Sequence, residues 1–133
     1  MTHVTAEAAE EDPSVILGTL RINSTPATVL FDSGASHSFI SQWFAKSHDI
    51  LFDEMSSPME INTLGSRWQT IWVVNGLTIV IGSLYFPIPL IALKSTDLDV
   101  ILGMDWLVQY KAIIDCAARS VVMTHPSGEV VRY

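Results

Sequence analysis

The segment Val29-Leu30-Phe31-Asp32-Ser33-Gly34-Ala35-Ser36 places an acidic residue at the end of an apolar strand and follows it with a hydroxyl and a glycine. An aspartate at such a strand end is held rigidly and is partly removed from water, and the glycine lets the backbone turn tightly beside it. Asp-Ser-Gly is also a common turn, so the tripeptide alone indicates only a loop. A second segment, Val100-Ile101-Leu102-Gly103, again ends an apolar strand with a glycine, and it leads into Met104-Asp105-Trp106-Leu107.

Outward from these segments, short apolar stretches separated by turn residues predict a mostly β domain. A hairpin is predicted for 15–22 and 27–31, joined by the turn at 23–26. Two short helices are also predicted. The first is capped by Ser36 or Ser38, carries an apolar face of Phe39, Ile40, Trp43 and Phe44 and ends near residues 46–49; the second carries Met104, Leu107 and Val108. The other predicted strands are 58–62, 67–74, 77–81, 84–93, 100–103, 112–115, 120–124 and 129–133.

Composition points to one compact acidic domain. The 133 residues are 49% hydrophobic, and 7 basic against 14 acidic side chains give a net charge of −7. The basic residues are scattered singly, which argues against a nucleic-acid-binding face. Because Glu7, Glu10, Glu11 and Asp12 gather near the start, residues 1–14 are predicted to be an acidic disordered arm, and residues 15–133 to be the folded domain.

Cysteine and histidine, the residue types that most often bind zinc, show no ligand-like spacing in this chain. Cys116 is the single cysteine, and His3, His37, His48 and His125 are far apart, so we expect no disulfide, no metal and no cofactor. A single cysteine also favours an intracellular, cytoplasmic setting. Residues 68–93 carry no charge and imitate a membrane span, but glycines and prolines divide them into pieces of strand length, so no membrane association is expected.

The two opening segments resemble the retropepsin-like aspartic proteases. More narrowly, 31–40 (FDSGASHSFI), 99–107 (DVILGMDWL) and 114–116 (IDC) are similar to the protease region of plant gypsy-type LTR-retrotransposon polyproteins, in order and spacing across 15–133. The resemblance implies a retropepsin-like closed β-barrel, the acid protease fold, with one or two short helices and half an active site per chain. It also implies an aspartic endopeptidase that processes a polyprotein.

Roles carried over by motif position centre on Asp32, the implied catalytic aspartate. Ser33 takes the position whose hydroxyl ties two active-site loops together, and Gly34 and Ala35 border the substrate backbone. Thr63, Leu64, Gly65 and Ser66 are the implied tip of a mobile flap that binds substrate, and Ile101, Leu102 and Gly103 are the implied structural segment beside the site.

Aspartic protease chemistry requires two carboxylates, one ionised to take a proton from water and one protonated to polarise the scissile carbonyl. No second Asp-Ser-Gly or Asp-Thr-Gly occurs here, and Asp97, Asp99, Asp105 and Asp115 are interpreted as solvent-facing caps or local salt bridges. The second Asp32 is therefore expected from another copy of the chain, in a homodimer that binds a peptide or polyprotein substrate.

Two departures and two alternatives accompany this interpretation. Viral retropepsins carry acidic residues after the first motif and an arginine after the second glycine; here Ser36, His37 and Met104 take those places, so a weak, concentration-dependent dimer is expected. One alternative is a catalytically silent, retroelement-derived dimerisation or peptide-binding module. A serine-hydrolase elbow at 34–38 is disfavoured because its final glycine is absent.

Overall fold

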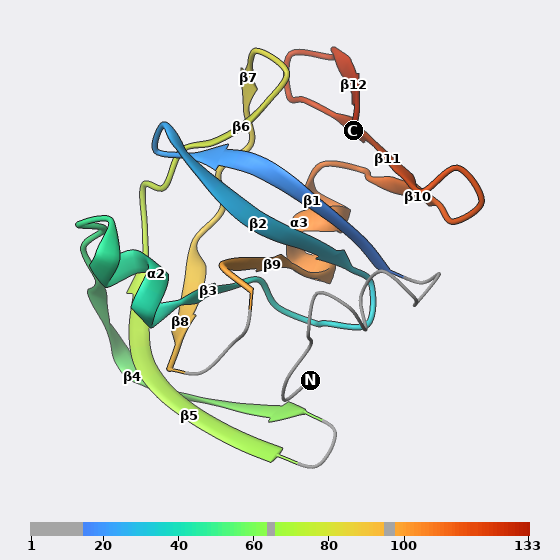
Figure 1. Ribbon diagram of the computed structural model, residues 1–133. Coiled ribbons are helices and arrows are strands. Elements are labelled where there is room, and N and C mark those ends of the chain that lie inside the picture. Colours follow the sequence, from blue (N-terminus) through green and yellow to red (C-terminus); the bar gives the residue numbers. More distant parts are fainter. Residues whose placement is uncertain (1–14, 64–65, 95–97) are drawn as a thin grey trace.

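The computed structural model describes residues 15–63, 66–94 and 98–133, in which strands dominate and two helices are short (Figure 1). The predicted mostly β class with two short helices is confirmed, while the predicted arm at 1–14 lies outside the described residues. The elements are β1 (Val15–Ile22), β2 (Thr25–Asp32), β3 (Phe39–Ser41), α2 (Gln42–Ser47), β4 (Asp53–Thr63), β5 (Ser66–Val74), β6 (Ile79–Ile81), β7 (Leu84–Tyr85), β8 (Leu90–Leu93), β9 (Val100–Leu102), α3 (Met104–Gln109), β10 (Ile113–Asp115), β11 (Ser120–Thr124) and β12 (Val130–Arg132).

The predicted first hairpin is present. Strands β1 and β2 pair antiparallel from Val15↔Asp32 to Ile22↔Thr25. Asn23 and Ser24 join them with φ values of 49° and 68°, the left-handed conformation that two-residue hairpin turns require. The second strand begins at Thr25, slightly earlier than predicted.

Among the described residues, nine strands form one sheet in the order β4-β5-β8-β3-β9-β2-β1-β6-β7, and the last three strands form a separate sheet in the order β10-β11-β12. Strand β9 lies between β2, with which it pairs parallel, and β3, with which it pairs antiparallel. The register Phe31↔Leu102 places the ends of the two opening segments side by side. Closure of the large sheet into a barrel stays a prediction.

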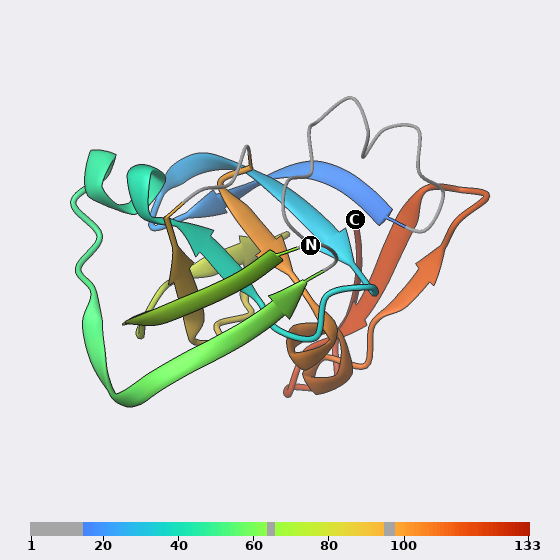
Figure 2. The same ribbon diagram turned by 90° about the horizontal axis from the view of Figure 1, so that it is seen from below.

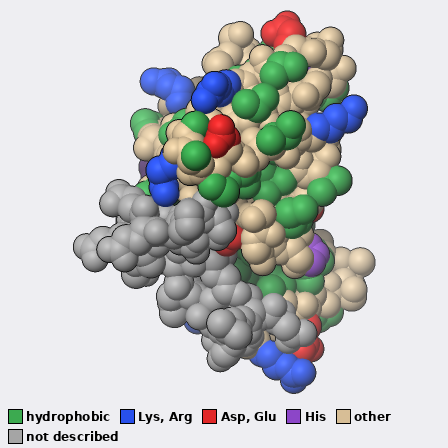
Figure 3. All heavy atoms as spheres, turned by 90° about the vertical axis from the view of Figure 1, so that its right-hand side faces the viewer, with side chains coloured by type: hydrophobic (Ala, Val, Ile, Leu, Met, Phe, Trp, Pro, Cys, Tyr) green, Lys and Arg blue, Asp and Glu red, His purple; other side chains and the backbone are tan. Residues whose placement is uncertain are grey.

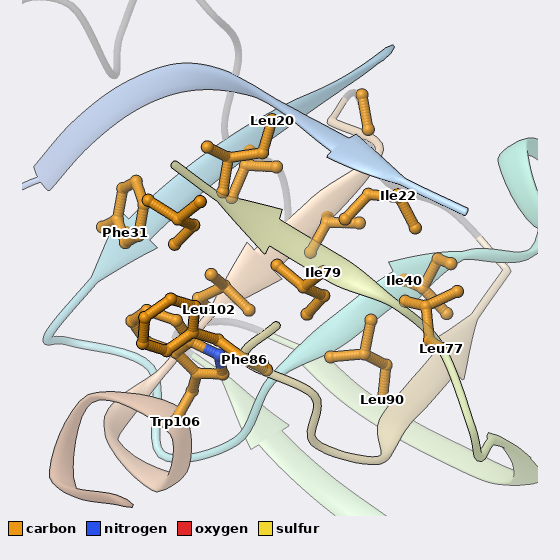
Figure 4. Close-up of a cluster of buried hydrophobic side chains, with 14 of the residues drawn as sticks. Leu20, Ile22, Phe31, Ile40, Leu77, Ile79, Phe86, Leu90, Leu102 and Trp106 are labelled. Atoms are coloured by element: carbon orange, nitrogen blue, oxygen red, sulfur yellow. Dashed lines mark hydrogen bonds between the residues drawn. The ribbon is translucent and has the colours of Figure 1, made fainter. Parts of the chain in front are cut away.

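The main hydrophobic core lies between the sheet and α3 (Figure 4). Trp106 is fully buried, with its ring centroid 5.8 Å from that of Phe31 and 6.1 Å from that of Phe86. Its Nε1 donates a hydrogen bond to the Phe86 carbonyl at 2.9 Å. Nearby, the Tyr110 hydroxyl donates to the Pro87 carbonyl, and burial raises the pKa of Tyr110. These contacts hold α3 at the end of β9.

A second, smaller cluster of buried side chains lies on the other side of β2 and β9. It joins residues of the two opening segments to the β4–β5 hairpin, because it includes Leu30, Ala35, Ile61 and Ile101. In Figures 1 and 2 this hairpin extends as a long curved arm, and its free end lies on the same side of the molecule as the loop that follows β2. The other buried members are Val15, Phe39, Ile91, Leu93 and Leu98.

The prediction of a helix carrying Phe39 and Ile40 was wrong. Both residues belong to β3, paired parallel with β8 and antiparallel with β9. The helix starts only at Gln42, and its cap is Ser41, whose Oγ accepts from the Phe44 amide at 3.3 Å, rather than Ser36 or Ser38. Pairing on both sides of β3 outweighs the local helical spacing.

Residues 68–93 form strands joined by turns, as predicted, but the strand expected at 84–93 is interrupted. Pro87 and Pro89 fall between β7 and β8, since proline cannot donate to a strand ladder. The hairpin strand expected at 58–62 is longer, starting at Asp53 with a register shift before Met59. Within the described ranges, no helix is long and apolar enough to cross a membrane.

Candidate active site

Asp32 lies at the end of β2 and is only 7% exposed. Its Oδ1 accepts a hydrogen bond from the Gly34 amide at 2.8 Å, and its carbonyl accepts one from the Ala35 amide at 3.2 Å. A Cβ at Gly34 would lie 3.1 Å from the same Oδ1. The loop therefore fixes the carboxylate by backbone donors and leaves little room for a side chain beside it.

The residues that follow β9 pack against this turn. The Met104 amide donates to the Ala35 carbonyl at 2.7 Å. Gly103 makes the approach feasible, because a Cβ there would lie 2.3 Å from the His37 carbonyl oxygen and 2.6 Å from that of Ala35. Leu102, which pairs with Phe31, is fully buried, and Gly103 lies directly against the loop that follows Asp32. The role of Ile101, Leu102 and Gly103 beside an active site stays a prediction.

Ser38 and Asp105 form a second tie between the two loops. The Ser38 Oγ donates to Asp105 Oδ1 at 2.5 Å, and the Ser38 amide donates to Oδ2 at 3.1 Å. The same Oγ accepts from the Gly103 amide at 3.0 Å, and Oδ1 also accepts from the Trp106 amide at 2.7 Å. Ser38 is fully buried.

This network corrects the interpretation of Asp105 as a solvent-facing cap or local salt bridge. Sequence reasoning missed the pair because Ser38 and Asp105 are far apart in the chain and have no short-range signal. Asp99 was also misread: its Oδ2 accepts from the Thr28 amide at 2.8 Å and hydroxyl at 3.0 Å, which ties the start of β9 to β2. Asp115 is a local cap, accepting from the Ala118 amide at 3.0 Å, and Asp97 lies outside the described residues.

The residues that replace the viral acids and arginine make different contacts. The Ser36 hydroxyl and His37 Nδ1 are hydrogen-bonded at 2.9 Å, and Met104 joins the loop through its backbone, as described above. Hydrogen bonds from Ser38 to Asp105 connect the segment that follows Asp32 with the helix that follows β9.

The β4–β5 hairpin approaches the site through its free end. Thr63 and Ser66 pair in register as the last described residues of the two strands, and Leu64 and Gly65 of the expected flap tip lie outside the described residues. Ile61, two residues before the end of β4, packs in the same hydrophobic cluster as Ala35. The flap role of this hairpin stays a prediction.

An apolar pocket of about 410 Å³ begins beside Asp32, at the exposed residue Ser33. It extends over α3 to β10, where Met104, Val108 and Ile113 are exposed to 39%, 66% and 68%. Across the part of the chain that the structure describes, no group of three or more His, Cys, Asp or Glu side chains is placed to hold a metal ion. The pocket is lined by Ser33, Met104, Leu107, Val108, Lys111, Ala112, Ile114 and Cys116.

Comparison with known proteins gives one family. A family model described as "Retroviral aspartyl protease" matches residues 1–129. A search of curated proteins finds no match.

Solved structures with a similar fold share little sequence with this chain. The retroviral protease-like domain of Ddi1 from Leishmania major superposes with a TM-score of 0.68 at 19% identity, covering 89% of this chain and 92% of that one. The EIAV protease in complex with the inhibitor HBY-793 gives 0.57 at 22% identity, covering 70% and 85%. A retropepsin-like aspartic protease from Rickettsia conorii gives 0.51 at 17% identity, covering 90% and 89%.

These likenesses confirm the retropepsin-like fold, and the family match covers nearly the whole chain, including both opening segments. The chain belongs to the retroviral aspartyl protease family.

Proposed function

We propose that this chain is an aspartic endopeptidase in which two copies each contribute Asp32 to one catalytic pair. The observation that carries the proposal is the position of Asp32 in a chain of the retroviral aspartyl protease family. Its carboxylate lies at a strand end, accepts a hydrogen bond from the Gly34 amide, and is followed by a loop that packs against Gly103. A single chain supplies one such carboxylate, so the active site is complete only in a dimer.

The chemistry follows from two carboxylates a few ångströms apart. Two charges that close cannot both be ionised, so the pair shares a proton. The ionised member takes a proton from a water molecule, the water oxygen attacks the peptide carbonyl carbon, and the protonated member donates to the carbonyl oxygen. Collapse of the tetrahedral intermediate breaks the C–N bond, with the proton passing to the leaving nitrogen. Gly34 and Ala35 would border the substrate backbone, and Thr63 to Ser66 would cover it.

The second copy would cover the face that begins at Ser33. This face carries the apolar pocket and the exposed side chains of Met104, Val108 and Ile113. Figure 3 views the molecule from the right-hand side of Figure 1, where β10 to β12 lie, and shows hydrophobic side chains spread between isolated charged ones. Strand β10 is at the edge of its sheet, pairing within the described residues with β11. An apolar pocket that begins at Ser33, with exposed apolar side chains along α3 and β10, supports a partner that would bring a second Asp32 to the same place.

The substrate in this proposal is a polypeptide, and specifically the retrotransposon polyprotein of which the domain would be a part. Support comes from the resemblance of the segments around Asp32 and Gly103 to gypsy-type elements, together with the family match. A cytoplasmic location is part of the proposal, since the single cysteine, Cys116, is exposed as a free thiol.

Cleavage of a peptide library at mildly acidic pH tests the proposal. We expect pepstatin-sensitive cleavage by the wild-type protein and none by Asp32→Ala, while the circular dichroism of the two proteins agrees. If the concentrated wild-type protein shows no cleavage beyond that of Asp32→Ala, the chain is a silent dimerisation or peptide-binding module and the proposal fails.

A concentration series tests the shared pair. Activity should rise faster than linearly with enzyme concentration, and Ile113→Glu should shift the curve to higher concentration because it places a charge on the proposed contact face. Leu51→Glu, at an 84% exposed position in another part of the fold, is the matched control and should leave the curve unchanged. Strict linearity with a monomer in light scattering would contradict the shared pair.

A further inference from the structure

A second pocket lies away from Asp32, between α2, the hairpin strand β5 and the end of β8 (Figure 1). Its volume of about 490 Å³ falls in the range of ligand-binding sites. None of the residues placed at the candidate active site lines it. Its lining residues are Gln42, Lys46, Pro58, Gln69, Thr70, Ile71, Trp72, Leu93 and Lys94.

The charge of this pocket is opposite to that of the chain. The protein has 7 basic and 14 acidic side chains, yet Lys46 and Lys94 both line this one pocket and none of its described lining residues is acidic. Both lysines are exposed, and neither forms an ion pair with the described residues. Two ammonium groups at a hollow, with no described carboxylate paired to them, attract negative groups, although the chain as a whole repels them.

The remaining polar groups define what kind of anion fits. The Thr70 hydroxyl and the Gln42 amide nitrogen already donate hydrogen bonds to the Ala92 carbonyl, at 3.0 and 3.3 Å. The exposed Gln69 side chain and the 37% exposed Trp72 ring complete the wall. No arginine lines the pocket among the described residues, and lysines act as flexible point charges rather than as a fixed fork for one phosphate. Such a surface suits carboxylates carried on an extended, partly apolar peptide.

The position of the pocket on the hairpin indicates which peptide can reach it. From Ser66, at the end nearest the site, Gln69 is three residues along β5 and Trp72 is six, which corresponds to about 10 and 20 Å of strand. A substrate strand lying along the hairpin advances by the same length per residue. Its side chains about three to six residues from the cleaved bond would therefore reach the lysines.

We propose that this pocket is an exosite for acidic side chains of the substrate polypeptide, about three to six residues from the cleaved bond. The proposal rests on the proposed protease function and names a substrate class for it: polypeptides with an acidic segment flanking the cleavage site. A long polyanion such as RNA is disfavoured, because two lysines stand against a surrounding net charge of −7.

The test uses two peptides with the same cleavable core, one followed by a Glu-Asp-Glu segment beginning at the third residue and the other by Gln-Asn-Gln. For the wild-type dimer we expect KM to be roughly threefold to tenfold lower for the acidic peptide at low salt, with kcat unchanged, because each exposed ion pair contributes modestly. High salt should remove the difference. Lys46→Gln/Lys94→Gln should lose it while cleaving the neutral peptide like the wild type.

Arg21→Gln/Arg132→Gln, which removes the same charge from β1 and β12, is the matched control and should keep the preference. Equal KM values for the two peptides in the wild type, or a preference that persists in Lys46→Gln/Lys94→Gln, would overturn the exosite. Fluorescence anisotropy of the labelled peptides on Asp32→Asn separates this outcome from failure of the protease proposal. Tighter binding of the acidic peptide there, lost in the lysine variant, supports the pocket even without cleavage, and equal binding rejects it.

Discussion

The loop that holds Asp32 and the β4–β5 hairpin that extends toward it are built in opposite ways. Buried and partly buried hydrogen bonds among Ser38, Gly103 and Asp105 tie the loop to the rest of the fold. Near its free end the hairpin reaches the buried clusters through Ile61, whereas its other end is held by the buried Val74 and by the pairing of β5 with β8. Its described ion pair, between Arg67 and Glu60, is exposed. A fixed carboxylate beside a lightly anchored arm suits an enzyme that must hold its reacting group still and admit a polypeptide.

Removing the Asp105 carboxylate should lower the stability of the fold more than any other change proposed below. Asp105→Ala leaves the Ser38 hydroxyl, the Ser38 amide and the Trp106 amide without their acceptor, at a cost of about 3 to 4 kcal/mol in unfolding free energy. Urea unfolding followed by tryptophan fluorescence measures it. Asp105→Asn, which keeps one acceptor oxygen, should recover part of the loss, and Asp115→Ala should change stability by less than about 0.5 kcal/mol. An Asp105→Ala effect as small as that of Asp115→Ala would show that the tie does not stabilise the fold.

Adding a methyl group at Gly103 should cause the second-largest loss of stability. Gly103 has φ −97°, which any residue adopts, so the cost of Gly103→Ala comes from the contacts with the His37 and Ala35 carbonyls and should reach about 2 to 3 kcal/mol. Gly76→Ala is the opposite case, with φ +71° and open space, and should cost about 1 kcal/mol. Thermal unfolding of both variants checks the order, and a reversed order would mean that the two loops separate easily.

A smaller side chain at Ile61 should make the β4–β5 hairpin more mobile and leave the loop that holds Asp32 unchanged. Ile61→Val removes one methyl group from the second cluster and should cost about 1 kcal/mol. Hydrogen exchange should accelerate mainly in β4 and β5. Ile79→Val, in the main cluster, is the control. It should lower the free energy of unfolding without accelerating hydrogen exchange in β4 and β5 more than elsewhere. Equal acceleration throughout the molecule in Ile61→Val would contradict a separately mobile hairpin.

The exposed ion pair of the hairpin should matter least. Arg67 Nε lies 3.3 Å from Glu60 Oε1, with the two side chains 80% and 49% exposed. A double-mutant cycle with Arg67→Gln and Glu60→Gln should give a coupling energy below about 0.5 kcal/mol. A coupling above about 1 kcal/mol would show that the arm is fixed by charge as well as by Ile61.

The sequence was sufficient for the parts of this comparison that depend on local pattern. Alternation and turn residues predicted the β1–β2 hairpin, and the apolar stretches at 27–31 and 100–103 predicted strands that the structure pairs in parallel as β2 and β9. Phe39 and Ile40 were assigned to a helix because the strands that flank β3 come from distant parts of the chain. Asp99 and Asp105 were misread for the same reason: their partners, Thr28 and Ser38, are brought to them only by the sheet.

The parallel pairing of β2 with β9 also sets the order of events during synthesis. Phe31 pairs with Leu102, so a nascent chain that has not yet produced β9 can place β1 on one side of β2 but leaves the other side unpaired. Pairings between such distant segments form late, because a long loop must close first. We therefore expect the geometry around Asp32 to form only after most of the domain has left the ribosome, since the turn that carries it is complete only once β9 has been made.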